Sequence, residues 1–283
     1  FHVPYFVTRA PTPIDESTML DVRDKLQALR DGLLPDSTAV AFPEPAILRM
    51  DGIPGLGRLQ LYLYDNGGEV FTDALRLQGF ASYVKSSPVI VWLVSLADLT
   101  EPTELLQLLR VYRESLLNMG ADPAHQSLVV VLTKADELES FTPRDAGEHD
   151  ATARGNDHDN ANGNGKPGHL PPSLRALLGQ TKQPARGYDF DELEAQSESL
   201  EGWLEGAAAQ HNFVRLARQT FATVRYCAAS ALGARPNGQQ LDGRATPRGV
   251  LVPLYWLVSL QRPKVTVHDA TGVWTTFSLL QAI

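Results

Sequence analysis

Hydrophobic positions along this chain follow two periods, and these divide it into strands and helices. Residues 58–64 carry leucine at every second position, which is typical of a strand with one buried face. Residues 46–50 predict a shorter strand, and the glycine-rich turn at 51–57 joins the two. We therefore expect an antiparallel hairpin in this part of the chain.

Three apolar runs further along predict strands of a different kind. They lie at 89–96, 127–132 and 222–228, and the first two are continuous enough for strands buried on both faces. Apolar residues recurring at intervals of three and four predict helices between and around the strands. These helices are expected near 15–32, 72–85, 102–119, 190–219 and 250–260. Strands alternating with helices predict an α/β fold, a doubly wound and mostly parallel sheet, with the hairpin as an antiparallel edge.

The composition changes abruptly at 141–169, which is polar and nearly free of aliphatic residues. Such a segment cannot bury enough surface to fold, so we predict a disordered insertion within one domain over residues 1–263. Residues 264–283 form a tail or the start of a further segment. Their pattern of strand, glycine-containing turn and apolar helix fits a terminal hairpin or helix, or a phosphate loop that has lost its lysine.

Composition and charge exclude several classes of function. The net charge of −8 argues against a nucleic-acid-binding face. No apolar run reaches the roughly 18 residues that a membrane span needs, and Cys227 is the single cysteine. A lone cysteine fits a reducing compartment, so we expect a cytoplasmic protein without a membrane span. The chain opens on Phe1 with no signal peptide, and we interpret it as a fragment.

Polar motifs follow the predicted strands where those strands end. Asp65 and Gly68 follow the strand at 58–64, and an aspartate there with a flexible glycine suits a magnesium ion beside a phosphate. Alone, this motif fits a strand followed by a turn equally well.

The next two motifs suit a purine base. Asp136, after the strand at 127–132, has a carboxylate that can accept hydrogen bonds from both N1 and the exocyclic amine of guanine. The stem of Lys134 can lie over the base, although Thr-Lys-Ala-Asp also fits an ordinary polar loop. Ser230 and Ala231 follow the strand at 222–228, where a small residue lets a backbone N–H reach a base oxygen. Open α/β sheets bind ligands at such carboxyl ends of strands.

Taken in order, D-x-x-G, [NT]-K-x-D and S-A-x resemble the motifs of a GTPase domain of the TRAFAC class of P-loop proteins. The resemblance spans about residues 32–260, and LLPDST with PLYWL is most similar to bacterial double-GTPase domains. It implies a sheet of P-loop NTPase type, GTP or GDP as the nucleotide, and Mg²⁺. The guanine-binding residues it implies are Thr133, Lys134, Asp136, Ser230 and Ala231.

The resemblance also implies residues at the phosphate end. Asp65 would hold magnesium through water, and the N–H of Gly68 would contact the terminal phosphate. Thr38 matches a switch threonine that reaches magnesium, or is simply a turn residue. Glu69 stands where relatives orient the attacking water, or it caps the start of a helix.

The phosphate-binding loop of that family, G-x-x-x-x-G-K-[ST], is missing from this sequence. We expect the first strand and the loop to lie upstream of Phe1, so that the full-length protein hydrolyses GTP with magnesium. The alternative is a pseudo-GTPase scaffold that binds protein partners without hydrolysis. A third possibility is an unrelated α/β domain whose motifs match by accident.

Overall fold

The computed structural model describes residues 12–34, 45–53, 57–64, 68–95, 99, 101, 103–140, 190–233, 236–238, 240–241, 245–260, 264–268 and 274–278. Thr38, Asp65 and the insertion at 141–169 lie outside these residues. Every helix in the described part of the chain is too short or too polar to cross a lipid bilayer.

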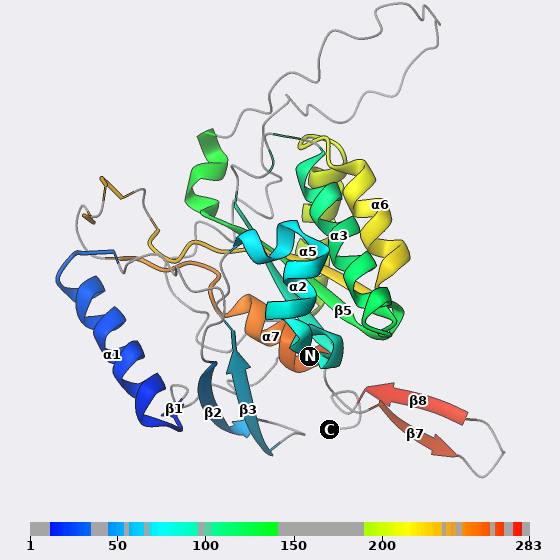
Figure 1. The fold of residues 1–283 in the computed structure, drawn as a ribbon, viewed down its shortest axis with the longest axis horizontal. Helices are drawn as coiled ribbons and strands as arrows, with labels where there is room; N and C mark the ends of the chain where they lie inside the picture. Colours follow the sequence, from blue (N-terminus) through cyan, green and yellow to red (C-terminus); the bar gives the residue numbers. More distant parts are fainter. Residues whose placement is uncertain are drawn as a thin grey trace, which may run out of the picture.

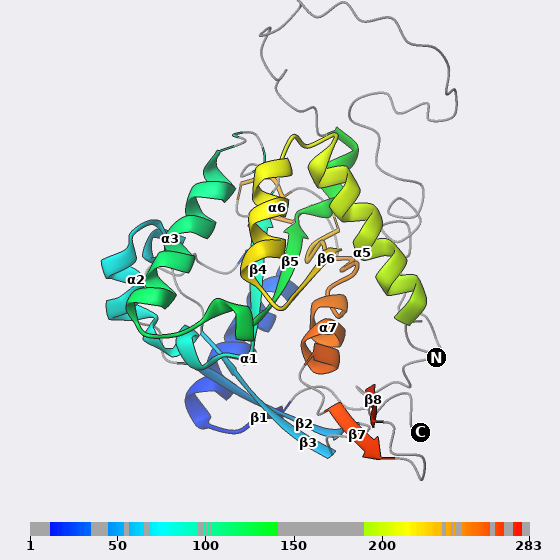
Figure 2. The same cartoon turned by 90° about the vertical axis from the view of Figure 1, so that its right-hand side faces the viewer.

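A parallel three-stranded sheet lies at the centre of the molecule (Figures 1 and 2). Its strands are β4 (Val89–Ser95), β5 (Ser127–Thr133) and β6 (Thr223–Ala228), in the order β4-β5-β6. The register sets Val89 opposite Ser127, and Ser127 opposite Thr223. These strands coincide with the three apolar runs predicted from the sequence. A strand that is covered on both faces must present apolar side chains to each of them.

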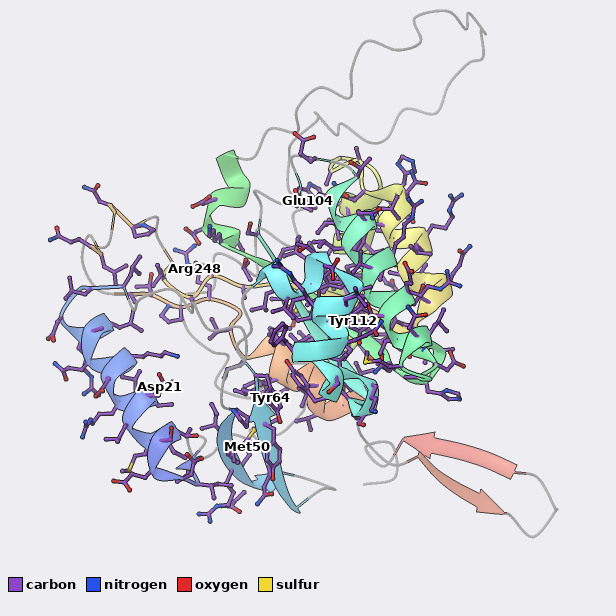
Figure 3. All side chains as sticks on the ribbon, in the orientation of Figure 1. Asp21, Met50, Tyr64, Glu104, Tyr112 and Arg248 are labelled. Carbon is purple, nitrogen blue, oxygen red and sulfur yellow. The ribbon has the colours of Figure 1, made fainter. Side chains whose placement is uncertain are left out.

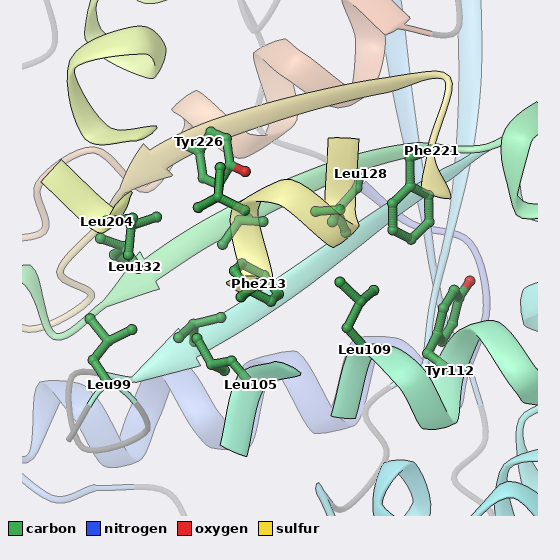
Figure 4. Close-up of a cluster of buried hydrophobic side chains, with 14 of the residues drawn as sticks. Leu99, Leu105, Leu109, Tyr112, Leu128, Leu132, Leu204, Phe213, Phe221 and Tyr226 are labelled. Carbon is green, nitrogen blue, oxygen red and sulfur yellow. The ribbon is translucent and has the colours of Figure 1, made fainter. Parts of the chain in front are cut away.

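Helices cover one face of this sheet. They are α2 (Ala74–Phe80), α3 (Glu104–Asn118) and α6 (His211–Thr220). Figure 4 shows the cluster between them, in which Leu105 and Leu109 of α3 meet Phe213 of α6 and Leu128 of β5. These four side chains are 0–1% exposed, so the helical period of α3 is set by burial against the sheet.

The opposite face is covered by α7 (Val252–Leu260), whose Tyr255 and Trp256 pack against Val129 and Val131 of β5. Helix α5 (Phe190–Glu205) lies along β6, and Ser197 Oγ accepts the N–H of Tyr226 at 2.9 Å. The outer edge of β6 is therefore covered by a helix. Helices on both faces of a parallel sheet confirm the predicted α/β class.

The predicted hairpin is confirmed as β2 (Ala46–Ile53) and β3 (Gly57–Leu63), which pair antiparallel. With β1 (Thr12–Pro13) they form their own three-stranded sheet, so their expected place as an edge of the parallel sheet is wrong for the described residues. The two sheets are joined by packing instead, because Met50 and Leu61 enter the cluster beneath α7.

Helix α1 (Glu16–Arg30) begins and ends as its sequence predicts. The Asp15 carboxylate accepts the Thr18 N–H at 2.8 Å and the Thr18 hydroxyl at 2.7 Å. These two bonds lower the pKa of Asp15. The helix ends at Arg30, and Gly32, two residues later, has a φ of +74°, a conformation that suits glycine.

Two predicted helices are shorter than expected. The segment 72–85 divides into α2 and two 3₁₀ turns, η1 (Gly68–Thr72) and η2 (Ser82–Ser86). The segment 190–219 is broken between α5 and α6, where Ala209 has a φ of +53°. Further 3₁₀ turns are η4 (Pro123–His125) and η5 (Ala135–Ser140).

The tail forms a hairpin of β7 (Lys264–His268) and β8 (Trp274–Ser278). This confirms the simpler of its two interpretations, and the apolar helix expected after the turn is wrong over Trp274–Ser278. The turn between the two strands lies outside the described residues.

Burial of β4 differs from expectation at one position. Val89 and Val91 join the cluster beneath α7, but Leu93, next on that face, is 64% exposed. On this face of the sheet, α7 packs against the amino half of β4 and leaves the carboxyl half uncovered.

Two leucines on neighbouring strands test this description. Leu132→Ala, at a fully buried position, should lower the free energy of unfolding by about 2–5 kcal/mol because it leaves a cavity. Leu93→Ala is the matched control and should cost less than about 1 kcal/mol. Chemical denaturation of both variants measures the difference, and equal losses would contradict the exposure of Leu93.

The single cysteine offers a second test. Cys227 is 3% exposed on β6, and burial raises the pKa of its thiol. We expect it to resist a thiol reagent in the native state and to react at the rate of unfolding as denaturant is added. Rapid labelling of the folded protein would contradict its burial.

Candidate functional site

Two of the three predicted motifs lie side by side at the carboxyl edge of the parallel sheet. Thr133 ends β5 and Ser230 follows β6, and these strands are neighbours running in the same direction. Their carboxyl ends therefore meet, as the sequence predicts for a ligand-binding edge. The site is built from the loops that leave these two strands.

The loop after β5 is held by hydrogen bonds to backbone carbonyls of neighbouring segments. The Thr133 hydroxyl donates to Val94 O of β4 at 3.2 Å, and the Ala135 N–H donates to Ala229 O at 3.2 Å. Between these anchors Lys134 has a φ of +56°, a region that non-glycine residues seldom adopt. Its side chain is exposed, while Ala135 is fully buried. The loop thus turns sharply and presents Lys134 to solvent.

Asp136 joins the two loops. The Ser230 hydroxyl donates to Asp136 Oδ1, and Ser230 Oγ accepts the Gly233 N–H at 2.8 Å. Ser230 is 1% exposed and Asp136 is half-buried. A buried hydroxyl that both donates and accepts fixes the carboxylate in place, while the carboxylate keeps lone pairs for further donors.

Residues 246–249, which the sequence analysis did not predict as part of the site, also hold the loop after β6 in place. Ser230 and Arg248 exchange two backbone hydrogen bonds of 2.9 and 2.8 Å, and the Thr246 N–H donates to Leu232 O at 2.8 Å. Gly249 has a φ of +64°, and a Cβ there would clash with Ala228 O. Gly249 was the one signal in the sequence, but a lone glycine does not reveal that its neighbour in space is Ala228, 21 residues earlier (249 − 228).

The described residues stop at Tyr64, directly before the first motif, and resume at its Gly68. Tyr64, the last residue described before Asp65, stacks on Tyr83 of η2 with ring centroids 3.8 Å apart. Because η2 precedes β4, this contact lies at the amino end of the parallel sheet. In Figure 3, Tyr64 lies apart from Arg248, which pairs with Ser230.

The remaining predicted residues are placed only in part. Gly68 begins η1 and is exposed, and the backbone of Glu69 follows it in that turn. Asp65 and Thr38, the predicted magnesium ligands, lie outside the described residues. Within the described part of the chain, no group of three or more acidic, histidine or cysteine side chains could hold a metal ion.

Known proteins add nothing to this geometry. No protein-family model, curated protein or solved structure matches the chain. Function must therefore be argued from the site alone.

A pocket of about 660 Å³ lies elsewhere, between α5 and the amino half of β6. Two ion pairs line it, Arg218 with Glu201 at 2.6 Å and Arg225 with Glu194 at 2.7 Å. We do not assign it to the site, because it lies away from the carboxyl edge of the sheet.

The bond between the two loops predicts a stability effect. Ser230→Ala leaves the Gly233 N–H and one side of Asp136 without their partner, and should cost about 1–3 kcal/mol. Ser115→Ala is the matched control, since this buried hydroxyl only donates to Val111 O of its own helix. Thermal or chemical unfolding compares the two variants. A loss no larger than that of the control would show that the hydroxyl does not hold the loops.

Proposed function

We propose that this chain is a guanine-nucleotide-binding domain of P-loop GTPase type, in which Asp136 selects the base. The observation that supports the proposal is the hydrogen bond from Ser230 to Asp136. It joins two motifs that lie 94 residues apart in the sequence and that suit the same ligand. The parallel strands by themselves bring the two loops to one sheet edge, but a chance match of two short motifs gives no reason for their side chains to form a hydrogen bond.

The chemistry of the base follows from this carboxylate. Guanine presents two N–H donors side by side, at N1 and at its exocyclic amine, and a fixed carboxylate can accept both. Adenine has an acceptor at N1 and cannot pair in this way. The exposed Lys134 would cover the base with its aliphatic stem, and Ala231 is small enough for its N–H to meet the base oxygen.

Hydrolysis of GTP with magnesium is a further part of the proposal. It would use Asp65 and Thr38 toward magnesium, Gly68 toward the terminal phosphate and Glu69 toward water. The printed sequence holds no G-x-x-x-x-G-K-[ST], so we propose hydrolysis only for a longer protein that carries this loop. A reducing compartment, and hence the cytoplasm, fits the lone buried thiol of Cys227.

A second candidate is a domain that keeps this shape to bind protein partners without hydrolysis. The stacking of Tyr64 on Tyr83 favours it, because it holds the end of β3 away from the loops that carry Asp136 and Ser230. Hydrolysis of GTP would need Asp65 and Gly68 beside the loops that carry Asp136 and Ser230, because a single nucleotide contacts both sets of residues.

Nucleotide affinity distinguishes the two candidates. With magnesium present, GTP should bind more tightly than ATP, and Asp136→Ala should weaken GTP binding by at least about 30-fold, or roughly 2 kcal/mol. Asp122→Ala is the matched control, an exposed aspartate at the amino end of β5. Calorimetry or fluorescence titration measures each constant.

Asp136→Asn tests the base contact by a change of nucleotide preference, which a misfolded protein could not show. An amide offers a donor where the carboxylate offers an acceptor, so this variant should lose GTP and gain xanthosine triphosphate, whose base has a carbonyl in place of the amine. If the chain binds neither GTP nor ATP, the nucleotide proposal fails and partner binding stands. If GTP binds but Asp136→Asn changes nothing, Asp136 does not select the base.

A further inference from the structure

Residues 246–249 form a short segment that lies against the loop after β6, and we call this segment the strap. Its Arg248, labelled in Figure 3, exchanges backbone hydrogen bonds of 2.9 and 2.8 Å with Ser230. Ser230 is the residue whose hydroxyl donates to Asp136. The strap therefore contacts the loop at the residue that holds the Asp136 carboxylate.

The strap comes closest to this loop at Gly233. A Cβ at this position would overlap both Thr246 O and Thr246 Oγ1. The backbone of Gly233 also has a φ of +76°, in the left-handed region that favours glycine. A side chain at position 233 is thus excluded twice, by the backbone conformation and by the contact with the strap.

The strap is held on both sides of this contact, so it cannot simply move aside. The Thr246 N–H donates to Leu232 O at 2.8 Å, and Gly249 O accepts the Val252 N–H of α7 at 3.1 Å. The overlap at position 233 includes a backbone carbonyl, which has none of the freedom of a flexible side chain. A side chain at position 233 would therefore displace the loop after β6 or break the bonds of the strap.

Gly233 also contacts Ser230 directly. Its N–H donates to Ser230 Oγ at 2.8 Å, and the same hydroxyl donates to Asp136 Oδ1. Ser230 is 1% exposed, so water has little access to replace the N–H of Gly233. Because a hydroxyl rotates to suit its partners, the N–H of Gly233 fixes the direction in which Ser230 donates.

We propose that Gly233 is a positioning residue for base selection, a role that rests on the proposed guanine site. The contact with the strap keeps the N–H of Gly233 aimed at Ser230 Oγ. The Ser230 hydroxyl then holds the Asp136 carboxylate toward the two N–H donors of guanine. Gly233 acts through Ser230, and the selection of the base depends on it.

Inosine triphosphate measures how well the carboxylate is aimed. Its base has the N1–H and the oxygen of guanine but lacks the exocyclic amine, so it loses one of the two contacts to Asp136. In calorimetry of the full chain with magnesium, GTP should bind at least about tenfold more tightly than inosine triphosphate. Gly233→Ala should bring this ratio close to one, whereas a general loss of stability would weaken both nucleotides equally.

Gly120→Ala is the matched control for backbone strain. Gly120 lies just after α3 with a φ of +73°, and no atom of the described residues lies within 4 Å of the Cβ that alanine would add. Gly238→Ala is a second control, in the chain that links the loop to the strap. Gly238 has a φ of +62° and equally open surroundings among the described residues. Neither control should change the ratio of the two affinities.

Ser230→Ala is a milder variant that tests the same path. It removes the hydroxyl through which Gly233 acts and leaves the contact with the strap in place, so it should also bring the ratio close to one. Circular dichroism confirms that each variant is folded. This variant keeps the test decisive if Gly233→Ala does not fold.

Unfolding without nucleotide tests the contact between Gly233 and Ser230 independently. Gly233→Ala should lower the denaturation midpoint less in a Ser230→Ala background than in the unaltered chain, because the shared hydrogen bond is already lost. Gly120→Ala should lower the midpoint equally in both backgrounds.

The outcomes separate this inference from the proposed function. An unchanged ratio in a folded Gly233→Ala or in Ser230→Ala would overturn the role of Gly233 and leave guanine binding intact. Equal lowering of the midpoint by Gly233→Ala in both backgrounds would overturn it as well. If the unaltered chain binds neither nucleotide, or binds both equally, the proposed base selection fails and the role of Gly233 in it fails too.

Discussion

Burial of β5 on both faces is the constraint on which the rest of this structure depends. Leu128, Val130 and Leu132 point to the side of α3 and α6, while Val129 and Val131 point to the side of α7. All five are 0–1% exposed. Such a strand cannot stand alone, because each face needs a layer of helices and each edge a neighbouring strand. The α/β class follows from this one segment.

The candidate site is a consequence of the same strand. Once β5 and β6 are parallel neighbours in a fixed register, the residues that leave their carboxyl ends must share one edge. Asp136 and Ser230 then meet without any long-range signal of their own. Short sequence motifs supply the polar side chains at this edge, and the packing of β5 and β6 in the apolar core sets their positions.

Much of the fold could be predicted from the sequence because apolar periodicity is local. The runs at β4, β5 and β6, the hairpin of β2 and β3, and helices α1, α3 and α7 all follow from it. The break between α5 and α6 was not predicted, although Gly206 directly follows α5, because the left-handed turn itself falls on Ala209 rather than on a glycine. Nor was the exposure of Leu93, since periodicity marks a face as apolar but does not say how far a helix covers it.

The site was predictable to a similar extent. The loops of Asp136 and Ser230 each follow an apolar strand, so their sheet edge could be inferred. The pairing of Ser230 with Arg248 is a contact between two irregular segments, and neither has a period that could reveal it. The stacking of Tyr64 on Tyr83, just before the first motif, is likewise a tertiary contact that no local pattern reveals.

The covering of β6 by α5 has a consequence for how this sheet can grow. Ser197 occupies a hydrogen-bonding position on the outer edge of β6, so a new strand there would first have to displace the helix. On the other side β4 has β5 as its sole strand partner among the described residues. Any strand that lengthens the parallel sheet, from this chain or another, must therefore join beside β4, next to the exposed Leu93.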